Sequence, residues 1–151
     1  MAKISTIGGS DIYLQRLNAL AGDQGGKAAK AAVYAGVKVL TDALRPAYEQ
    51  TLSSNSTGQM LAAMGVTPIQ LDQRGWWNAK IGFDGYDVRK AKNFPRGVPH
   101  QLKARVIESG TKNKHIKGHQ VIKRAVKANR AAVEKAMEQA LDLEIRKIME
   151  G

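Results

Sequence analysis

The end of the chain carries a hydrophobic repeat that only a long α-helix can satisfy. Between Gln120 and Met149 apolar side chains recur every three or four residues, which places them on one helical face. The repeat consists of Ile122, Val126, Val133, Met137, Ala140, Leu141, Ile145 and Ile148. The sequence therefore predicts a helix over 120–149, about 45 Å long. A compact domain of this size is only about 30 to 35 Å across. We therefore expect Met137, Leu141 and Ile145, in the far half, to pack against another chain.

A short helix with a glycine stop is predicted ahead of this long helix. Pro99 keeps a regular helix from extending back beyond His100, because proline lacks an amide donor and restricts the residue before it. Gly110 is the expected end, since a residue without a Cβ takes positive φ at little steric cost. The apolar face between these limits consists of Leu102, Val106 and Ile107. A basic loop follows Thr111.

Two amphipathic helices are predicted in the first third of the chain. The first follows Asp11 and ends at Gly22. The glycine-rich segment after it lacks the spacing and the hydroxyl residue of a Walker A phosphate loop, so we interpret it as a flexible joint. The second helix runs from about Lys27 to Arg45, where Pro46 is expected to kink or end it. Its apolar face consists of Val33, Val37, Leu40 and Leu44.

The middle of the chain changes to the two-residue period of half-buried strands. Ser56 and Gln59 form the pattern of a capping box ahead of a short helix. The alternating apolar residues beyond it are Ile69, Leu71, Trp77, Ala79, Ile81 and Phe83. With a turn at 72–75, this pattern predicts a small antiparallel hairpin with Trp77 in the core and Trp76, on the opposite face, as a covered or interface aromatic. Together these elements predict an α+β fold in one domain spanning 1–151.

The positive charge of the chain is concentrated in one third of its length. The net charge is +11, and residues 74–124 hold thirteen Lys and Arg against three Asp and Glu. Within this segment, residues 84–100 have no sustained period and predict a long basic loop, which is usually functional or disordered at such a length. Its candidate contact residues are Arg89, Lys90, Lys92, Phe94 and Arg96. Such a basic segment is usually a solvated face, but its concentrated charge also attracts polyanions such as duplex DNA.

No pattern typical of catalysis or metal binding appears. The chain has no cysteine, which excludes disulfides and thiolate chemistry. His115 and His119 are four residues apart, but the Glu of the zinc-protease motif is missing and three lysines surround them. We therefore expect no catalytic centre, no cofactor and no metal. No stretch approaches the roughly 18 to 20 apolar residues of a membrane span, and the first residues lack the pattern of a secretory signal.

Two short motifs and the order of the elements resemble a known family. Residues 57–61 read Thr-Gly-Gln-Met-Leu, and Glu108, Ser109, Gly110 and Thr111 close the short helix. With two N-terminal helices, a hairpin, a basic loop and a long last helix, the chain resembles the tailed-phage neck and tail-component family, the gene-product-ten-like proteins of lambdoid phages. It departs from that pattern at Ser109, where the family usually has an aromatic residue.

The resemblance implies a structural virion protein without enzymatic activity. Such a protein would form a homo-oligomeric ring, a hexamer or dodecamer, at the neck between the capsid portal or connector and the tail, in head-tail joining or tail completion. Its partners would be other phage connector, neck and tail proteins, and it would assemble in the host cytoplasm. Glu108, Gly110 and Thr111 would belong to the interface. The alternatives are a basic, sequence-independent nucleic-acid-binding protein and, third, a small enzyme with His115 or His119 as its base.

Overall fold

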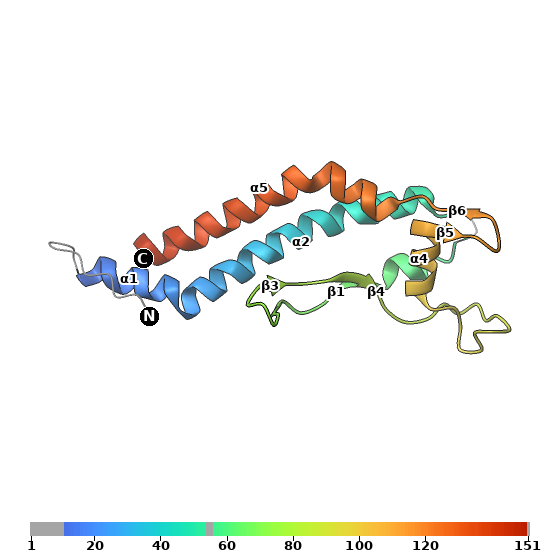
Figure 1. Cartoon of the computed structure of the whole chain (residues 1–151), viewed down its shortest axis with the longest axis horizontal. Helices are drawn as coiled ribbons and strands as arrows, with labels where there is room; N and C mark the ends of the chain where they lie inside the picture. The colour runs from blue at the N-terminus through green and yellow to red at the C-terminus, as the bar shows by residue number, and fades with distance from the viewer. Residues whose placement is uncertain (1–10, 54–55, 151) are drawn as a thin grey trace.

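The computed structural model describes residues 11–53 and 56–150, with side chains from Gln15 onward, and arranges them as an elongated molecule (Figure 1). Its helices are α1 (Asp11–Ala21), α2 (Asp23–Thr51), α3 (Gln59–Ala62), α4 (His100–Ser109) and α5 (Val121–Glu150). Its strands are β1 (Met64–Val66), β2 (Gln70–Leu71), β3 (Trp77–Asn78), β4 (Ile81–Phe83), β5 (Gly110–Thr111) and β6 (Ile116–Lys117). The predicted α+β class with a long C-terminal helix is confirmed.

One part of the molecule is a pair of antiparallel helices, which we call the shaft (residues 11–43 and 126–150). Figure 1 shows α5 running back along α2 as far as α1. Ala28, Ala32 and Gly36 are buried at four-residue spacing on α2. A Cβ added at Gly36 would lie 2.7 Å from Cγ of Met137, so α5 packs against α2 where the side chains are smallest. The buried row of the shaft therefore consists of small residues, and Val33 and Val37 lie beside it, half-buried.

The hydrophobic core lies at the other end, which we call the head (residues 44–66 and 81–125). The last turns of α2, the first turns of α5, and α3, β1 and α4 meet there. The core residues are Leu44, Tyr48, Met60, Met64, Ala104, Val121 and Ala125. Tyr48 is 0% exposed, and its ring meets that of Phe83 edge to face at a centroid distance of 5.2 Å. This packing brings together segments that are far apart in sequence.

The predicted hairpin forms, in two short ladders. β1 pairs with β4 and β2 with β3, both antiparallel, and Asp72 closes the turn by accepting hydrogen bonds from the backbone amides of Arg74 and Trp76. Trp77 is half-buried with the Lys30 ammonium 4.6 Å from its ring centroid, whereas Trp76 is 72% exposed. Trp77 is thus the more buried of the two tryptophans, but it lies outside the core cluster, and no described residue covers Trp76.

Helix α2 is longer than the sequence predicts. It begins at Asp23 and continues through Pro46 to Thr51. The helix does not end at Pro46, because Leu44 and Tyr48 are both buried in the head core and hold the helix on either side of the proline. The expected flexible joint is reduced to Gly22 alone, since Gly25 and Gly26 already lie inside the helix.

The expected capping box does not form. Gly58, with φ 72°, occupies the N-cap of α3, and the hydroxyl of Ser56 accepts from the amide of Gly58. The side chain of Gln59 instead accepts from the amide of Val88 at 3.1 Å. The reason is tertiary, because the segment that follows β4 packs against the start of α3 and takes the Gln59 side chain. Gln59 thus fastens the basic loop to the head.

Helix α5 has the predicted position and length, but its far half lies alongside its own chain. The premise that such a rod outruns the domain is wrong, because the domain is elongated rather than globular. Arg16 of α1 donates hydrogen bonds to the carbonyl oxygens of Met149 and Glu150. Within the described residues no helix is both long enough and apolar enough to cross a membrane.

Candidate functional site

The predicted basic loop folds back on itself as a finger (residues 88–97). At its base the amide of Asp87 donates to the carbonyl of Val98 at 2.9 Å, and near its tip the amide of Phe94 donates to Ala91 at 2.8 Å. The segment has no helix, and only isolated bridges join its two sides. Its basic residues are all exposed and consist of Arg89, Lys90, Lys92 and Arg96. The finger is therefore held together at its base by hydrogen bonds, and its basic side chains project into solvent.

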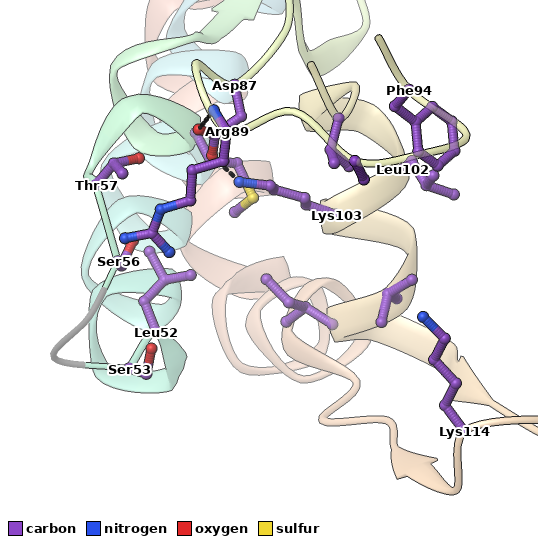
Figure 2. Close-up of a pocket in the computed structure, with 15 residues that line it drawn as sticks. Leu52, Ser53, Ser56, Thr57, Asp87, Arg89, Phe94, Leu102, Lys103 and Lys114 are labelled. Carbon is purple, nitrogen blue, oxygen red and sulfur yellow. Dashed lines mark hydrogen bonds and ion pairs between the residues drawn. The ribbon is translucent and has the colours of Figure 1, made fainter.

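A buried ion pair fastens the base of the finger to α4 (Figure 2). Asp87 is 2% exposed, and one of its carboxylate oxygens accepts from the ammonium of Lys103. The other accepts from the amide of Arg89 at 2.9 Å. Burial lowers the pKa of the Lys103 ammonium. Because Asp87 is used inside the head, it makes no ion pair with Lys90, Lys92 or Arg96 of the finger.

A second carboxylate joins the end of α4 to the start of α5. The two oxygens of Glu108 accept from the amides of Ile122 and Lys123 at 2.8 and 3.1 Å. A carboxylate there satisfies amides that have no partner within the helix and complements the helix dipole. The amide of His119 also donates to the carbonyl of Ile107 at 2.7 Å. Glu108, expected at an interface, is therefore engaged within its own chain.

Gly110 ends α4 as predicted, and a small hairpin follows instead of a plain loop. Its φ is 71°, and a Cβ there would lie 2.2 Å from the carbonyl oxygen of Ile116. The close approach of β5 and β6 therefore requires glycine. Thr111 is half-buried in β5, and its hydroxyl has no hydrogen-bond partner among the described residues.

The head accordingly carries a large local excess of positive charge. Residues 85–120 hold nine Lys and Arg and two acids, Asp87 and Glu108, both of which are used internally. Several exposed cations make no ion pair with any described residue. These are Lys90, Lys92, Arg96, Arg105, Lys112, Lys114 and Lys117. Such a surface attracts an acidic partner.

An apolar pocket of about 450 Å³ opens between these charges. Its apolar lining consists of Leu52, Met60, Ala91, Phe94, Val98, Leu102, Val106 and Ile107. Arg89 from the finger and Lys114 from the turn between β5 and β6 also line it, and Figure 2 places them on different sides. We call it the head pocket. It combines an apolar floor with a basic rim, and Phe94 belongs to its wall.

The other predicted contact residues lie on the shaft, away from the finger. Met137 packs against Gly36 of α2, and Ile145 is half-buried. Leu141 remains 36% exposed and Leu143 55% exposed. The structure thus gives two separate candidate surfaces, one on the head and one on the far half of α5.

The two histidines of interest do not share a helical face. His115 lies in the turn between β5 and β6 with φ 50°, and His119 precedes α5. Both are exposed. In the described part of the chain, no group of three residues of metal-binding type is close enough to hold an ion.

Sequence reasoning missed the residues that organise the site. Asp87, Lys103 and Lys114 were not identified as a set, although an acid isolated in a basic loop is a usable signal. No protein-family model, no curated protein and no solved structure matches the chain. Function is therefore inferred from the geometry and charge of the chain itself, together with the family resemblance.

Proposed function

We propose that this protein is a structural subunit of a tailed-bacteriophage virion, which forms a homo-oligomeric ring at the neck between the capsid portal or connector and the tail. One observation carries most weight: the head presents unpaired cations around an apolar pocket, while the two acids of residues 85–120 are buried or cap a helix. A partner protein with acidic and apolar side chains would neutralise this positive charge and cover the apolar pocket.

The two segments that resemble the neck and tail-component family support this proposal by their position. Residues 57–61 contribute Met60 to the head core and Gln59 to the fastening of the finger. Residues 108–111 contribute Glu108, which caps α5, and Gly110, which allows β5 and β6 to approach. Both motifs therefore shape the head, where subunit or neighbour contacts are proposed.

In this role the protein has no catalytic activity and needs no cofactor or metal. It assembles in the host cytoplasm and then resides in the neck of the virion. Its neighbours are further copies and other connector, neck and tail proteins. Duplex DNA passes through the ring, so tight phosphate binding inside the bore would hinder ejection. Most of the basic side chains of the head are accordingly assigned to protein contacts.

The proposal is tested by the mass of the assembled species. The purified chain is measured by sedimentation velocity and mass photometry across a concentration series, and particles are imaged by electron microscopy. We expect a closed ring of defined order. A monomer at every concentration, absent from purified virions by peptide mass spectrometry, would refute the proposal.

Sequence-independent nucleic-acid binding is the second candidate, and the unpaired cations of the head favour it. Fluorescence anisotropy with labelled duplexes of different sequence distinguishes the two. Under the structural proposal, binding is weak, indifferent to sequence and lost between about 50 and 200 mM salt. Tight binding that discriminates between sequences at the higher salt would favour the second candidate instead.

A further inference from the structure

The far half of α5 carries a surface opposite in charge to the head. Glu134, Glu138 and Asp142 recur at four-residue spacing, which places them in one row on the helix, and all three are exposed. We call this row the acidic stripe. Arg130 pairs with Glu134 at 3.1 Å, and Arg146 follows the row at its other end. Glu138 and Asp142 make no ion pair with any described residue.

Apolar area accompanies these carboxylates. Leu141 lies three residues after Glu138 and directly before Asp142, and it is 36% exposed. Ile145, one turn further on, is half-buried. Elsewhere along the described sequence, exposed acids occur singly. The acidic stripe thus combines negative charge with an exposed leucine.

The head presents the complementary combination. The finger carries Lys90, Lys92 and Arg96 without ion-pair partners among the described residues, and Lys114 lines the head pocket from the opposite loop. The apolar floor of the pocket lies between them. A partner that fits this surface brings a protruding apolar side chain flanked by carboxylates.

We infer that subunits contact each other head to tail, with the finger and head pocket of one copy docked on the acidic stripe and Leu141 of the next. This inference rests on the proposed ring and names the contact that builds it. The two surfaces lie on different parts of the same chain, so the contact is heterologous, the type that closes into rings when the rotation between copies allows it. Charge complementarity also fixes the register and direction of docking.

A phosphate backbone fits the head less well than a second copy does. Single-stranded nucleic acid stacks its bases on exposed aromatic rings, and the head offers only Tyr86 among its described residues, since Phe94 is half-buried in the wall of the head pocket. The exposed Trp76 lies at the turn between β2 and β3, which Figure 1 places along the shaft. The basic rim of the head pocket could meet a phosphate, but its apolar floor makes no favourable contact with one. The pocket accommodates a protein side chain.

The test uses two full-length variants with neutral replacements. The finger variant carries Lys90→Ala, Lys92→Ala and Arg96→Ala, and the stripe variant carries Glu138→Gln, Leu141→Ala and Asp142→Asn. Because the replaced side chains are exposed or, for Leu141, partly exposed, circular dichroism should match the parent chain. Control variants remove charges of α2 that lie outside both surfaces, Lys27→Ala with Lys38→Ala, and Asp23→Asn with Glu49→Gln.

Each variant alone should associate at least about tenfold more weakly than the parent chain, and the controls should assemble normally. A mixture of the two variants should form a heterodimer and nothing larger, because each retains one intact half of the contact. This result is specific to a head-to-tail interface.

The other outcomes separate the two proposals. If the parent chain forms a ring and both variants do as well, the head-to-tail inference is wrong while the ring stands. If the finger variant keeps the ring but loses binding to a labelled duplex, the head-to-tail inference is also wrong, because the finger then binds nucleic acid instead of a second copy. If the parent chain is monomeric throughout, the proposed ring itself fails.

Discussion

The head and the shaft are built from different kinds of contact. The head is organised around Tyr48, which is 0% exposed, and around two carboxylates, Asp87 and Glu108, that join segments distant in sequence. The shaft is two helices packed along the row Ala28, Ala32 and Gly36, and most of its larger apolar residues are only half-buried. The head depends on a few individual contacts, whereas the shaft repeats the same helix–helix contact turn after turn.

This difference predicts where single changes matter. Removing one group from the head disconnects a whole segment, because no neighbouring contact repeats its function. Removing one group from the shaft leaves the same contact intact one turn away. Four substitutions test the comparison, from the largest expected effect to the smallest.

Replacing Gly110 should damage the head most. In Gly110→Ala the new Cβ would lie 2.2 Å from the carbonyl oxygen of Ile116, at a φ of 71° that side chains rarely adopt. We expect a loss of about 4 kcal/mol in the free energy of unfolding, measured by urea titration. Gly65→Ala is the control, because a Cβ there meets nothing within 4 Å. Equal losses of unfolding free energy in both variants would show that the glycine at the end of α4 has no special role.

Removing the partner of the buried carboxylate should come second. Lys103→Met leaves Asp87, 2% exposed, without its ammonium, and should cost about 3 kcal/mol. Limited proteolysis should then cut the finger first. Adding Asp87→Asn should restore part of the loss, since the uncompensated charge is gone. Arg105→Met, an exposed neighbour on α4, serves as the control and should change stability little. A finger that stays protected in Lys103→Met would contradict the role of the ion pair.

The head should also respond to alkaline pH through Tyr48. Burial, with a smaller contribution from Glu108, raises the pKa of Tyr48 from 10.0 to about 12. An unfolded chain therefore releases this proton at lower pH than the folded chain. The stabilisation is complete below pH 10 and is lost as the pH rises toward 12.

Tyr48→Phe should remove that dependence. The hydroxyl has no hydrogen-bond partner among the described residues, so stability at pH 7 should hardly change. Between pH 9 and 11.5 the parent chain should lose about 1 to 2 kcal/mol more than the variant in urea titrations. Tyr34→Phe, at a position that is 66% exposed, should behave like the parent chain. Identical pH profiles for parent and Tyr48→Phe would show that this phenol does not couple to folding.

The smallest effect is expected on the shaft. Arg130 and Glu134 form an ion pair at 3.1 Å, but their side chains are 79% and 61% exposed. Water and salt screen such a pair, so Arg130→Ala should change the unfolding free energy by less than about 0.5 kcal/mol. Thermal unfolding followed by circular dichroism would measure it. A loss comparable to that of Lys103→Met would remove the distinction between the two regions.

Several elements could be predicted because their signals are local. The repeat from Ile122 to Ile148 defines α5, and the alternation from Trp77 to Phe83 defines the strands. Gly110 ends α4 because positive φ is a property of a single residue. The concentration of charge in 74–124 is likewise visible without coordinates.

Parts of the candidate site could not be predicted, because pairing between distant segments has no local signal. Asp87 and Lys103 are sixteen residues apart, and Glu108 reaches amides fourteen and fifteen residues further on. The isolation of Asp87 in a basic loop marks it as unusual, but nothing in the sequence around either acid says which segment it contacts. That Lys90, Lys92 and Arg96 make no ion pair with a described residue follows only once both acids are placed.

By itself, the sequence determined the element types, the glycine stop and the location of the charge, since periodicity and backbone freedom depend on neighbouring residues alone. The tertiary structure decided which faces are buried. Ala28, Ala32 and Gly36 form the buried row of α2 because α5 packs there, and Val33 and Val37 lie beside it. It also decided that α2 continues through Pro46, since core packing on both sides of the proline outweighs its local preference to end a helix.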